Sequence, residues 1–485
     1  MTSRRQPVAP IVVLLVVALI PAVALLIGWR SLSRNDDTQG EVEIEPSLSS
    51  ETAFVPGGRQ LLTFRRAAIE LSGQANRGQL ESDLAAVTQL MAPASCLAVS
   101  VDGVAISGTS DVAAIPASTI KILVAAAALD VLGDDFTFRT TVLGEPPSSG
   151  VINGDVTLVG GGDPLLSGEW YASSGLDRFP VFGETSLDDL ARQLSALGVQ
   201  RITGSIVGNG SRYDNEWYYD EWGDGIAGIE AGPFDALLAN DARVEGDQYR
   251  WSDPAAGAAA EFVIRLRAAG ITVDGGSRSE EGEPRGNELA AVTSGPLALV
   301  VAEMLQNSDN NTAEMLLKEI GVATSGEGSR DAGIAAVVDL LEQQGVSTDG
   351  LVLVDGSGLS NTARIRCSTL VEVLDGAHPS LHDGLAVAGV SGTLASVFTE
   401  GPMTGRLHGK TGTLSNIPFD ADPPAVKALA GEFDVGDVGS ERIRFALVLN
   451  QYMVNDQANY RPIWDALAAA LSRYPSGPGI AEMSP

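Results

Sequence analysis

Ser118 and Lys121 lie three residues apart and could together carry out nucleophilic catalysis. The residues from Ile122 to Leu132 are almost all apolar and Gly133 follows, so the sequence predicts a buried helix that opens at Ser118. Positions three apart share one face of a helix, one turn from each other. A lysine flanked by apolar core loses solvation, which lowers the pKa of its amine. The pair therefore supplies a serine nucleophile and an amine that can serve as its base.

Two further strings carry polar groups, Ser-Asp-Asn at residues 308–310 and Lys-Thr-Gly at residues 410–412. A Ser three residues before a Lys arises by chance about once in a chain of ordinary composition, whereas each of these tripeptides arises in roughly one chain in ten or fewer. Ser-Asp-Asn alone also suits helix capping. All three strings in this order are hard to obtain by accident, so they predict one catalytic site.

The use of lysine supports a chemical role for Lys121. Of 31 Lys and Arg residues only four are lysines, namely Lys121, Lys318, Lys410 and Lys427, and two of these lie in the motifs. Arg stays protonated in proteins, whereas a desolvated Lys can give up its proton and act as a base. We therefore prefer this interpretation to that of a solvated surface lysine.

The second and third motifs are expected on a loop and on a strand. Helices are predicted over 297–306 and over 312–320, the latter with a stop at Gly321, so Ser308 and Asn310 lie on a short loop between rigid elements. A strand is predicted over 406–414, where glycines flank the Lys-Thr pair. Glycine inside a strand often marks close approach by a ligand or another backbone.

Other segments predict the surrounding framework. Residues 97–107 are predicted to form two short strands joined at Asp102-Gly103, a dipeptide favoured in tight hairpin turns. Strands are also predicted over 154–159, 201–207, 261–267 and 443–450, helices over 186–197 and 462–471, and an exposed loop over 274–288. Gly160-Gly161-Gly162 is interpreted as a turn, because no Gly-Lys-Ser/Thr follows it.

Composition indicates a large globular protein. The chain has 485 residues, 44% of them hydrophobic and 19% charged, which predicts two domains. A formal net charge of −31 argues against nucleic acid as a partner, because phosphate binding needs clustered cations. His378, His382 and His408 have no metal-ligand company in the sequence and are interpreted as structural, so no metal site is expected.

The N-terminal region predicts attachment to a membrane. Arg4 and Arg5 precede an uncharged, largely apolar run over 8–29, which is long enough to cross a bilayer. Ala22-Val23-Ala24 fits a signal-peptide cleavage pattern, but the apolar run continues past it, which favours an uncleaved anchor within residues 1–30. The arginines place the N-terminus in the cytoplasm and the catalytic part outside. Residues 31–55 are expected to form a flexible linker.

The two cysteines, Cys96 and Cys367, fit an exported protein. An even number in an oxidising compartment permits one disulfide, which we predict between them. Two buried free thiols are the alternative.

With these motifs in place, the chain resembles the penicillin-binding D-alanyl-D-alanine carboxypeptidases and endopeptidases of the class C low-molecular-mass group, peptidase family S13. The resemblance runs from about residue 57 to about residue 450. Besides the three motifs it includes Gly-Gly-Gly-Asp-Pro at 160–164, Asp-Gly-Ser-Gly-Leu-Ser at 355–360, and Gly-Thr-Leu at 392–394 with Phe398. It departs from the family at Val397, where Arg is common, and at Asn209, where Asp is usual.

The resemblance implies an α+β fold, in which a penicilloyl-serine transferase domain of the β-lactamase/transpeptidase type carries a large inserted mixed α/β domain. The expected catalytic domain comprises residues 56–145 and 290–475, the insert residues 146–289, and the tail residues 476–485. The insert is shorter than in well-known relatives, which predicts that a second insert subdomain is reduced or missing.

The resemblance also implies a serine-type D-Ala-D-Ala carboxypeptidase acting on peptidoglycan stem peptides, with β-lactam antibiotics as covalent inhibitors and no metal or organic cofactor. A DD-endopeptidase that cuts cross-links is the main alternative. A β-lactamase and an inactive wall-binding scaffold are remote ones, because the insert and the intact motifs argue against them.

Each motif residue receives a role from the family. Ser118 would attack the penultimate carbonyl and Lys121 would take its proton. Ser308 would relay a proton to the leaving amine, and Asn310 would hold a substrate amide. Lys410 and Thr411 would bind the terminal carboxylate, with Gly412 beside them, and the backbone N–H groups of Ser118 and Thr413 would form the oxyanion hole.

Overall fold

The computed structural model describes residues 64–106, 110–222, 225–415, 422–436 and 441–483. The predicted anchor within residues 1–30, the predicted linker over 31–55 and the first residues of the predicted catalytic domain, 56–63, lie outside these residues. Within the described part of the chain, no helix is both long and apolar enough to cross a membrane.

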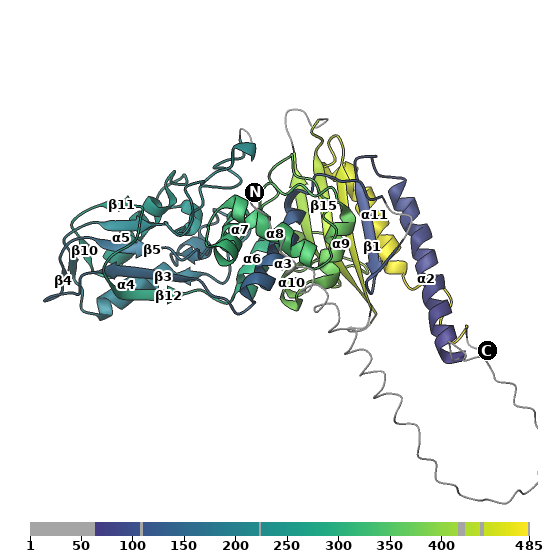
Figure 1. Cartoon of the computed structure of the whole chain (residues 1–485), viewed down its shortest axis with the longest axis horizontal. Helices are drawn as coiled ribbons and strands as arrows, with labels where there is room; N and C mark the ends of the chain where they lie inside the picture. Colours follow the sequence, from purple (N-terminus) through teal and green to yellow (C-terminus); the bar gives the residue numbers. More distant parts are fainter. Residues whose placement is uncertain (1–63, 107–109, 223–224, 416–421, 437–440, 484–485) are drawn as a thin grey trace, which may run out of the picture. The chain divides into compact units, whose positions relative to one another are not determined.

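The largest sheet has six antiparallel strands (Figure 1). Two core clusters lie on its opposite faces, because alternate residues of each strand point to opposite sides. Its strands, in spatial order, are β13 (Ala386–Val387), β14 (Leu407–Leu414), β15 (Val426–Val435), β16 (Glu441–Asn450), β1 (Cys96–Val101) and β2 (Val104–Ala105).

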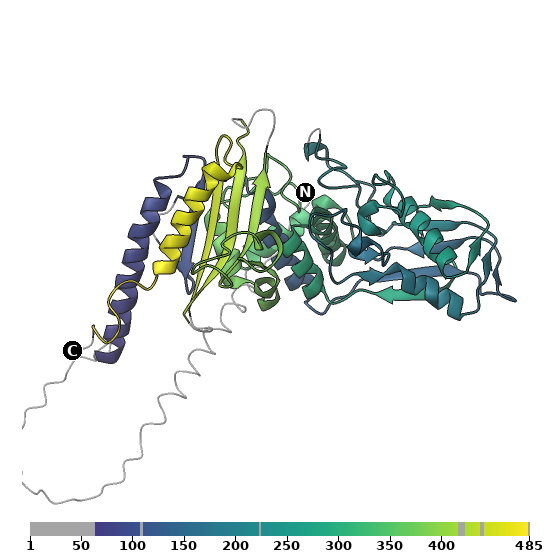
Figure 2. The same ribbon diagram turned by 180° about the vertical axis from the view of Figure 1, so that it is seen from behind.

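Two terminal helices cover one face of this sheet (Figures 1 and 2). They are α2 (Phe64–Thr88) and α11 (Gln457–Arg473), which contact each other and bury Leu84 and Trp464 against the strands. Gly477 donates its N–H to Asn76 Oδ1, so the start of the C-terminal segment is tied to α2.

A group of helices packs on the other face and leads into the insert. Its centre is α3 (Lys121–Leu132), whose residues from Lys121 to Leu129 are all buried, as its uniform apolarity predicts. The helices around it are α6 (Leu297–Asn307), α7 (Asn310–Ser325), α8 (Arg330–Gln343), α9 (Cys367–Gly376) and α10 (Pro379–Gly384).

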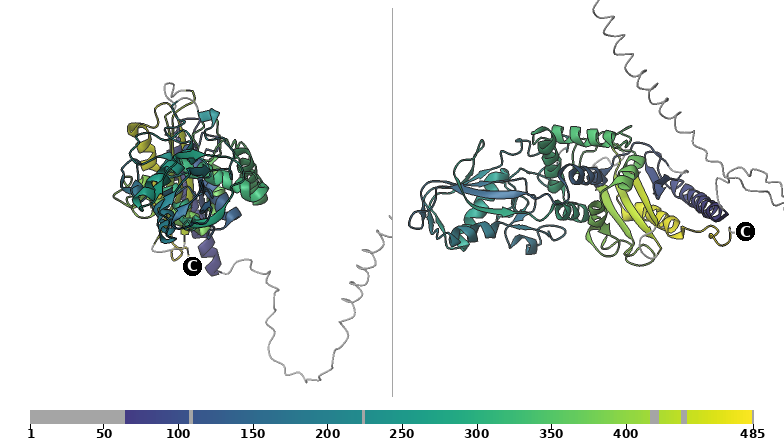
Figure 3. Two further views of the ribbon diagram at one scale, coloured as in Figure 1. Left: turned by 90° about the vertical axis from the view of Figure 1, so that its left-hand side faces the viewer. Right: turned by 60° about the horizontal axis from the view of Figure 1, so that its bottom comes forward.

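The insert is a mixed α/β unit with its own core (Figures 1 and 3). Its main sheet has the order β11 (Ser277–Ser279), β9 (Ile206–Asn209), β5 (Val156–Val159), β3 (Arg139–Gly144), β12 (Asn287–Thr293). Small sheets join β10 (Thr272–Val273), β8 (Arg201–Ile202) and β4 (Val151–Ile152), and β6 (Leu166–Ser167) with β7 (Thr185–Ser186). Helices α4 (Leu187–Ala196) and α5 (Pro254–Ala268) contact each other and the main sheet.

The α+β prediction is confirmed by this arrangement. The predicted limits of the insert, 146–289, stay a prediction. In the main sheet of the insert, β3 lies before residue 146 and its partner β12 continues past residue 289. Several local predictions are confirmed: the hairpin turn at Asp102-Gly103 has positive φ at both residues, and the Ser186 hydroxyl caps α4.

Three local predictions are wrong. The predicted strand 261–267 is part of helix α5, which Asp253 caps and Pro254 opens, and its burial on several sides hides the helical period. The predicted strand 201–207 is two strands, β8 and β9. Helix α7 does not stop at Gly321 but continues to Ser325; an added Cβ at Gly321 would lie 2.6 Å from the Glu327 carbonyl oxygen, so this glycine serves packing.

Two other predicted segments are partly right. The predicted loop 274–288 contains β11 and the first residues of β12. The predicted C-terminal helix 462–471 is longer at both ends, because it begins at Gln457, after the Asp456 cap, and keeps Pro462 inside.

Candidate active site

Ser118 lies in a tight turn that leads directly into α3. The turn is the 3₁₀ helix η1 (Ala117–Ile120), so Ser118 precedes the α-helix rather than opening it. Ala117 is buried and has a left-handed backbone with φ 48°. Two glycines allow neighbouring backbones to approach it: a Cβ on Gly358 would lie 2.0 Å from the Ala117 carbonyl oxygen, and one on Gly412 would lie 3.0 Å from that of Pro116. The nucleophile is thus held between two other segments.

Lys121 is fully buried and reaches three oxygen atoms. Its Nζ lies 3.0 Å from Ser118 Oγ, 2.7 Å from Asn310 Oδ1 and 2.6 Å from the Ser357 carbonyl oxygen. Burial lowers the pKa of Lys121 to about 8, although the carboxylates of Glu314, Asp309 and Asp355 act in the opposite direction. The structure therefore brings the predicted nucleophile and base together and gives the base a pKa near neutrality.

The second motif joins α6 to α7, but only Ser308 and Asp309 lie between the helices as predicted, because the Asp309 cap starts α7 at Asn310 rather than at Thr312. Ser308 ends α6 with a left-handed backbone, φ 65°, and Asp309 caps α7 by accepting the N–H of Thr312 at 2.5 Å. Asn310 begins α7 and donates through Nδ2 to the Glu230 carbonyl of the insert at 2.8 Å, which directs its Oδ1 towards Lys121. The capping function and the placement of polar groups beside Ser118 therefore coexist in one tripeptide.

The third motif lies in the middle of β14. Lys410 is buried, and its Nζ donates to Ser308 Oγ at 2.7 Å and to the Thr411 carbonyl at 2.9 Å. Burial holds the pKa of Lys410 well below its usual range, and the positive charges of Lys121 and Lys427 act in the same direction.

A cleft of about 360 Å³ joins these motifs. Ser118, Ser308, Asn310, Thr411 and Thr413 all line it, whereas Gly412 packs behind Ser118 against the Pro116–Ala117 backbone. The close approach predicted from the glycine inside this strand is therefore confirmed, with a backbone as the neighbour.

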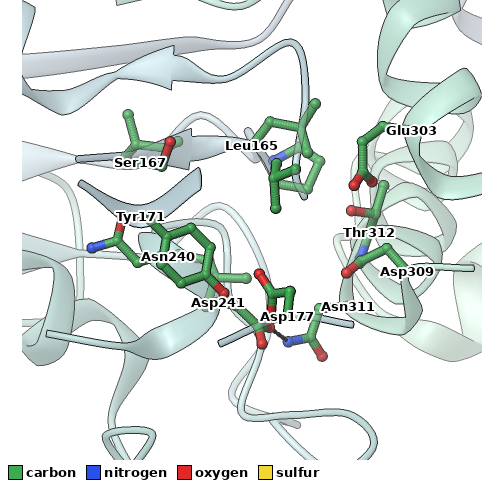
Figure 4. Close-up of a pocket in the computed structure, with 14 residues that line it drawn as sticks. Leu165, Ser167, Tyr171, Asp177, Asn240, Asp241, Glu303, Asp309, Asn311 and Thr312 are labelled. Carbon is green, nitrogen blue, oxygen red and sulfur yellow. Dashed lines mark hydrogen bonds between the residues drawn. The ribbon is translucent and has the colours of Figure 1, made fainter. Parts of the chain in front are cut away.

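The insert supplies part of the cleft wall that the sequence reasoning missed. Its residues that line the cleft include Leu176, Asp177, Arg178, Phe179, Val181 and Arg243. Figure 4 shows the adjoining pocket, where Asp177 and Asp241 of the insert face Glu303 and Asp309 of the catalytic part. Burial raises the pKa of Asp241 to about 6 and that of Glu303 well above its usual range. No local pattern in the sequence signals these contacts.

Two groups outside the motifs also support the site. The Asp355 carboxylate accepts the N–H groups of Gly358 and Ser360, each at 2.8 Å. Glu314 of α7 is fully buried, and its carboxylate accepts N–H groups of the same loop. The sequence does not single out Glu314, because α7 also carries Lys318 and Glu319 among its buried residues.

The two cysteines form the predicted disulfide, with their Cα atoms 5.7 Å apart. The bond joins the first residue of β1 to the first residue of α9. The three histidines each lie near a carboxylate, as His382 does with Glu432, but none of them lines the cleft.

Comparison with known proteins decides the family. The family model described as the D-Ala-D-Ala carboxypeptidase 3 (S13) family matches residues 78–245 and 233–474. The chain belongs to this family. It is 32% identical over 371 residues to the carboxypeptidase DacB of Mycolicibacterium smegmatis, covering 73% of this chain and 75% of the relative. It is 30% identical over 389 residues to the D-alanyl-D-alanine carboxypeptidase of Actinomadura sp. strain R39, covering 62% and 69%.

A solved structure in the same fold is penicillin binding protein 4 (dacB) of Haemophilus influenzae. The TM-score is 0.64 at 21% sequence identity, and the match covers 80% of this chain and 99% of that chain. The resemblance to family S13 and the fold that it implied are therefore confirmed.

Proposed function

We propose that this member of the S13 family is a serine-type D-Ala-D-Ala carboxypeptidase that cleaves peptidoglycan stem peptides through an acyl-enzyme. The observation that carries the proposal is the contact between Lys121 Nζ and Ser118 Oγ, 3.0 Å apart, at the wall of an open cleft. A desolvated amine beside a hydroxyl is an activated nucleophile.

In the acylation step, Ser118 Oγ attacks the carbonyl of the penultimate D-Ala and its proton passes to Lys121. The backbone N–H groups of Ser118 and Thr413 stabilise the oxyanion. The C–N bond then breaks, and the proton that Lys121 accepted passes through the Ser308 hydroxyl, which contacts Lys410, to the amine of the terminal D-Ala, so Lys121 is neutral again. Lys410 and Thr411 hold the terminal carboxylate, while Asn310 holds a substrate amide.

In the deacylation step, water attacks the ester carbonyl. Lys121 accepts a proton from this water and returns it to Ser118 Oγ as the ester C–O bond breaks and the shortened peptide leaves. A β-lactam presents a carboxylate and a strained amide to the same groups, so we propose that it acylates Ser118 and leaves slowly. A crystal structure of penicillin binding protein 4 of the same fold contains a β-lactam, which supports this proposal.

Intact-mass analysis after penicillin treatment tests the proposal. We expect one adduct on the peptide containing Ser118, and Ser118→Ala should lose both the adduct and release of D-alanine from a D-Ala-D-Ala peptide. Ser472→Ala, on α11 and outside the cleft, is the control and should retain both. Release of D-alanine by Ser118→Ala would overturn the mechanism. A DD-endopeptidase differs only in the leaving amine, so product analysis on cross-linked muropeptides distinguishes the two activities.

We also propose that residues 8–29 form an uncleaved anchor and that the catalytic part lies outside the cytoplasmic membrane. The proposal is supported by the apolar run that follows Arg4 and Arg5, and the disulfide fits an oxidising compartment. N-terminal sequencing of the mature protein should find the residues of the run retained. A mature start near Leu25 would show instead that the segment is a cleaved signal peptide.

A further inference from the structure

Lys121 has three hydrogen-bond partners, and their geometry matters once the amine is neutral. A charged lysine has three N–H donors, whereas a neutral amine has two N–H groups and one lone pair. Two of the partners, Asn310 Oδ1 and the Ser357 carbonyl, can only accept a hydrogen bond. When they take the two N–H groups, the lone pair is left facing the third partner, the Ser118 hydroxyl. The Ser357 carbonyl therefore helps to orient the Lys121 lone pair towards Ser118.

The position of that carbonyl depends on a buried carboxylate. Glu314 Oε1 accepts the N–H of Ser357 at 2.7 Å, and Glu314 Oε2 accepts the N–H of Gly356 at 2.9 Å. The loop also packs closely against α7, since a Cβ on Gly356 would lie 2.6 Å from the Ala313 carbonyl oxygen. The two N–H groups would otherwise be buried donors with a substantial desolvation cost.

Helix α7 therefore reaches Lys121 by two routes. Asn310 and Glu314 are four residues apart and so lie on one face of the helix. Asn310 contacts the amine directly, and Glu314 acts through the Gly356–Ser357 backbone. A rigid helix can hold both acceptors at fixed positions, which a catalytic constellation requires.

We propose that Glu314 is a positioning residue for acylation: it fixes the Gly356–Ser357 backbone so that the Ser357 carbonyl accepts one Lys121 proton and the amine lone pair faces Ser118. The inference rests on the proposed function, in which Lys121 is the base. Asp355 holds the other end of the loop through Gly358 and Ser360.

Glu314 also has an electrostatic effect that can be measured separately. The carboxylates facing Lys121 are Glu314, Asp309 and Asp355, all of which favour its protonated form, while Lys410 carries the nearby positive charge. Burial and the neighbouring Asp355 raise the pKa of Glu314 to about 7, and Tyr219 of the insert also faces it. Loss of the Glu314 charge should therefore lower the pKa of Lys121.

Two substitutions separate position from charge. Glu314→Gln keeps the shape but leaves one oxygen to accept two N–H groups, and it removes the charge. Glu314→Asp keeps the charge but shortens the reach to the loop. The matched control is Glu319→Gln, because Glu319 is equally buried on the same helix but binds Arg212 and Tyr213 instead.

The experiment measures the second-order rate of acylation by a fluorescent penicillin, with the full chain, between about pH 5 and pH 10. We expect both Glu314 variants to lower the maximal rate by about tenfold or more, and Glu319→Gln to stay within about twofold of wild type. The acid limb of the profile should move to lower pH in Glu314→Gln only. Thermal unfolding of each variant shows whether the fold is retained.

The outcomes that would overturn the proposal are distinct. A folded Glu314→Gln protein that acylates within about twofold of wild type would refute it, as would equal losses in Glu314→Gln and Glu319→Gln. If Glu314→Gln does not fold, Glu314→Asp decides alone, and a rate near that of wild type refutes the proposal. If wild type itself is not acylated at Ser118, the proposed function fails instead.

Discussion

Replacement of Lys121 by arginine tests the central chemical claim, that this residue acts as the base. Lys121→Arg keeps the positive charge, but a guanidinium group does not deprotonate in proteins. The side chain is fully buried, with its Nζ between 2.6 and 3.0 Å from three oxygen atoms, so the charge is retained in the same place while the proton acceptor is lost. General base catalysis contributes about 10²–10⁴-fold, and we expect acylation to fall by that factor.

The pH dependence gives a second magnitude. With a pKa of about 8, Lys121 is neutral in about one tenth of the molecules at pH 7 and in about nine tenths at pH 9. The base works when it is neutral, so the wild-type acylation rate should rise about tenfold over this interval. In Lys121→Arg that rise should disappear, because no titration of residue 121 remains.

Stopped-flow measurement with a fluorescent penicillin gives both quantities. Lys318→Arg is the matched control, because Lys318 is also a fully buried lysine on a helix, but its Nζ binds Asp214 and the Glu216 carbonyl, away from Ser118. Any general cost of fitting arginine into a buried site appears in this control. An acylation rate for Lys121→Arg near that of wild type, or a retained rise between pH 7 and pH 9, would refute the assignment of the base.

Three further predictions concern other parts of the molecule. Because burial lowers the pKa of Lys410, its attraction for a substrate carboxylate should weaken as pH rises, so KM for a D-Ala-D-Ala peptide should increase with pH; a constant KM would contradict this. Replacing Cys96 and Cys367 by serine should reduce the free energy of unfolding by about 2–4 kcal/mol in a urea titration, and an unchanged midpoint and slope would contradict it. Gly358→Ala should lower both Tm and the acylation rate, because Gly358 has φ 80° and its Cβ would meet the Ala117 carbonyl oxygen; a wild-type rate would show that this contact is dispensable.

Predictions from sequence succeeded where the signal was local. The uniformly apolar stretch of α3, the Asp102-Gly103 turn and the Ser186 cap each depend on a few adjacent residues. They failed where burial on several sides erased the period, as in α5, or where a glycine served packing rather than termination, as at Gly321. Cap residues were available at Asp253 and Pro254 and would have identified α5 as a helix.

The sequence motifs identify the residues of the site, but they do not predict which groups those residues contact. Lys121 binds Asn310 across 189 residues and Ser357 across 236 residues, and the second partner is a backbone carbonyl that any residue type would supply. Contacts of this kind arise from the packing of α3, α7 and the 355–360 loop. A sequence pattern carries no information about them, and it does not single out Glu314 either, because α7 also buries Lys318 and Glu319.

The charge balance of the site explains why the two motif lysines suit different tasks. Lys121 lies among the carboxylates of Glu314, Asp309 and Asp355, which keep its pKa near 8 in spite of full burial. The charged groups that act on Lys410, among the residues that the structure describes, are the lysines Lys121 and Lys427, so its positive charge lacks a counter-ion there. A buried charge without a partner is costly, and a substrate carboxylate beside Lys410 would remove that cost. In the proposed mechanism the terminal carboxylate of the substrate therefore forms an ion pair with Lys410. Lys121, which must lose its proton, instead has hydrogen-bond acceptors within the protein, Asn310 Oδ1 and the Ser357 carbonyl.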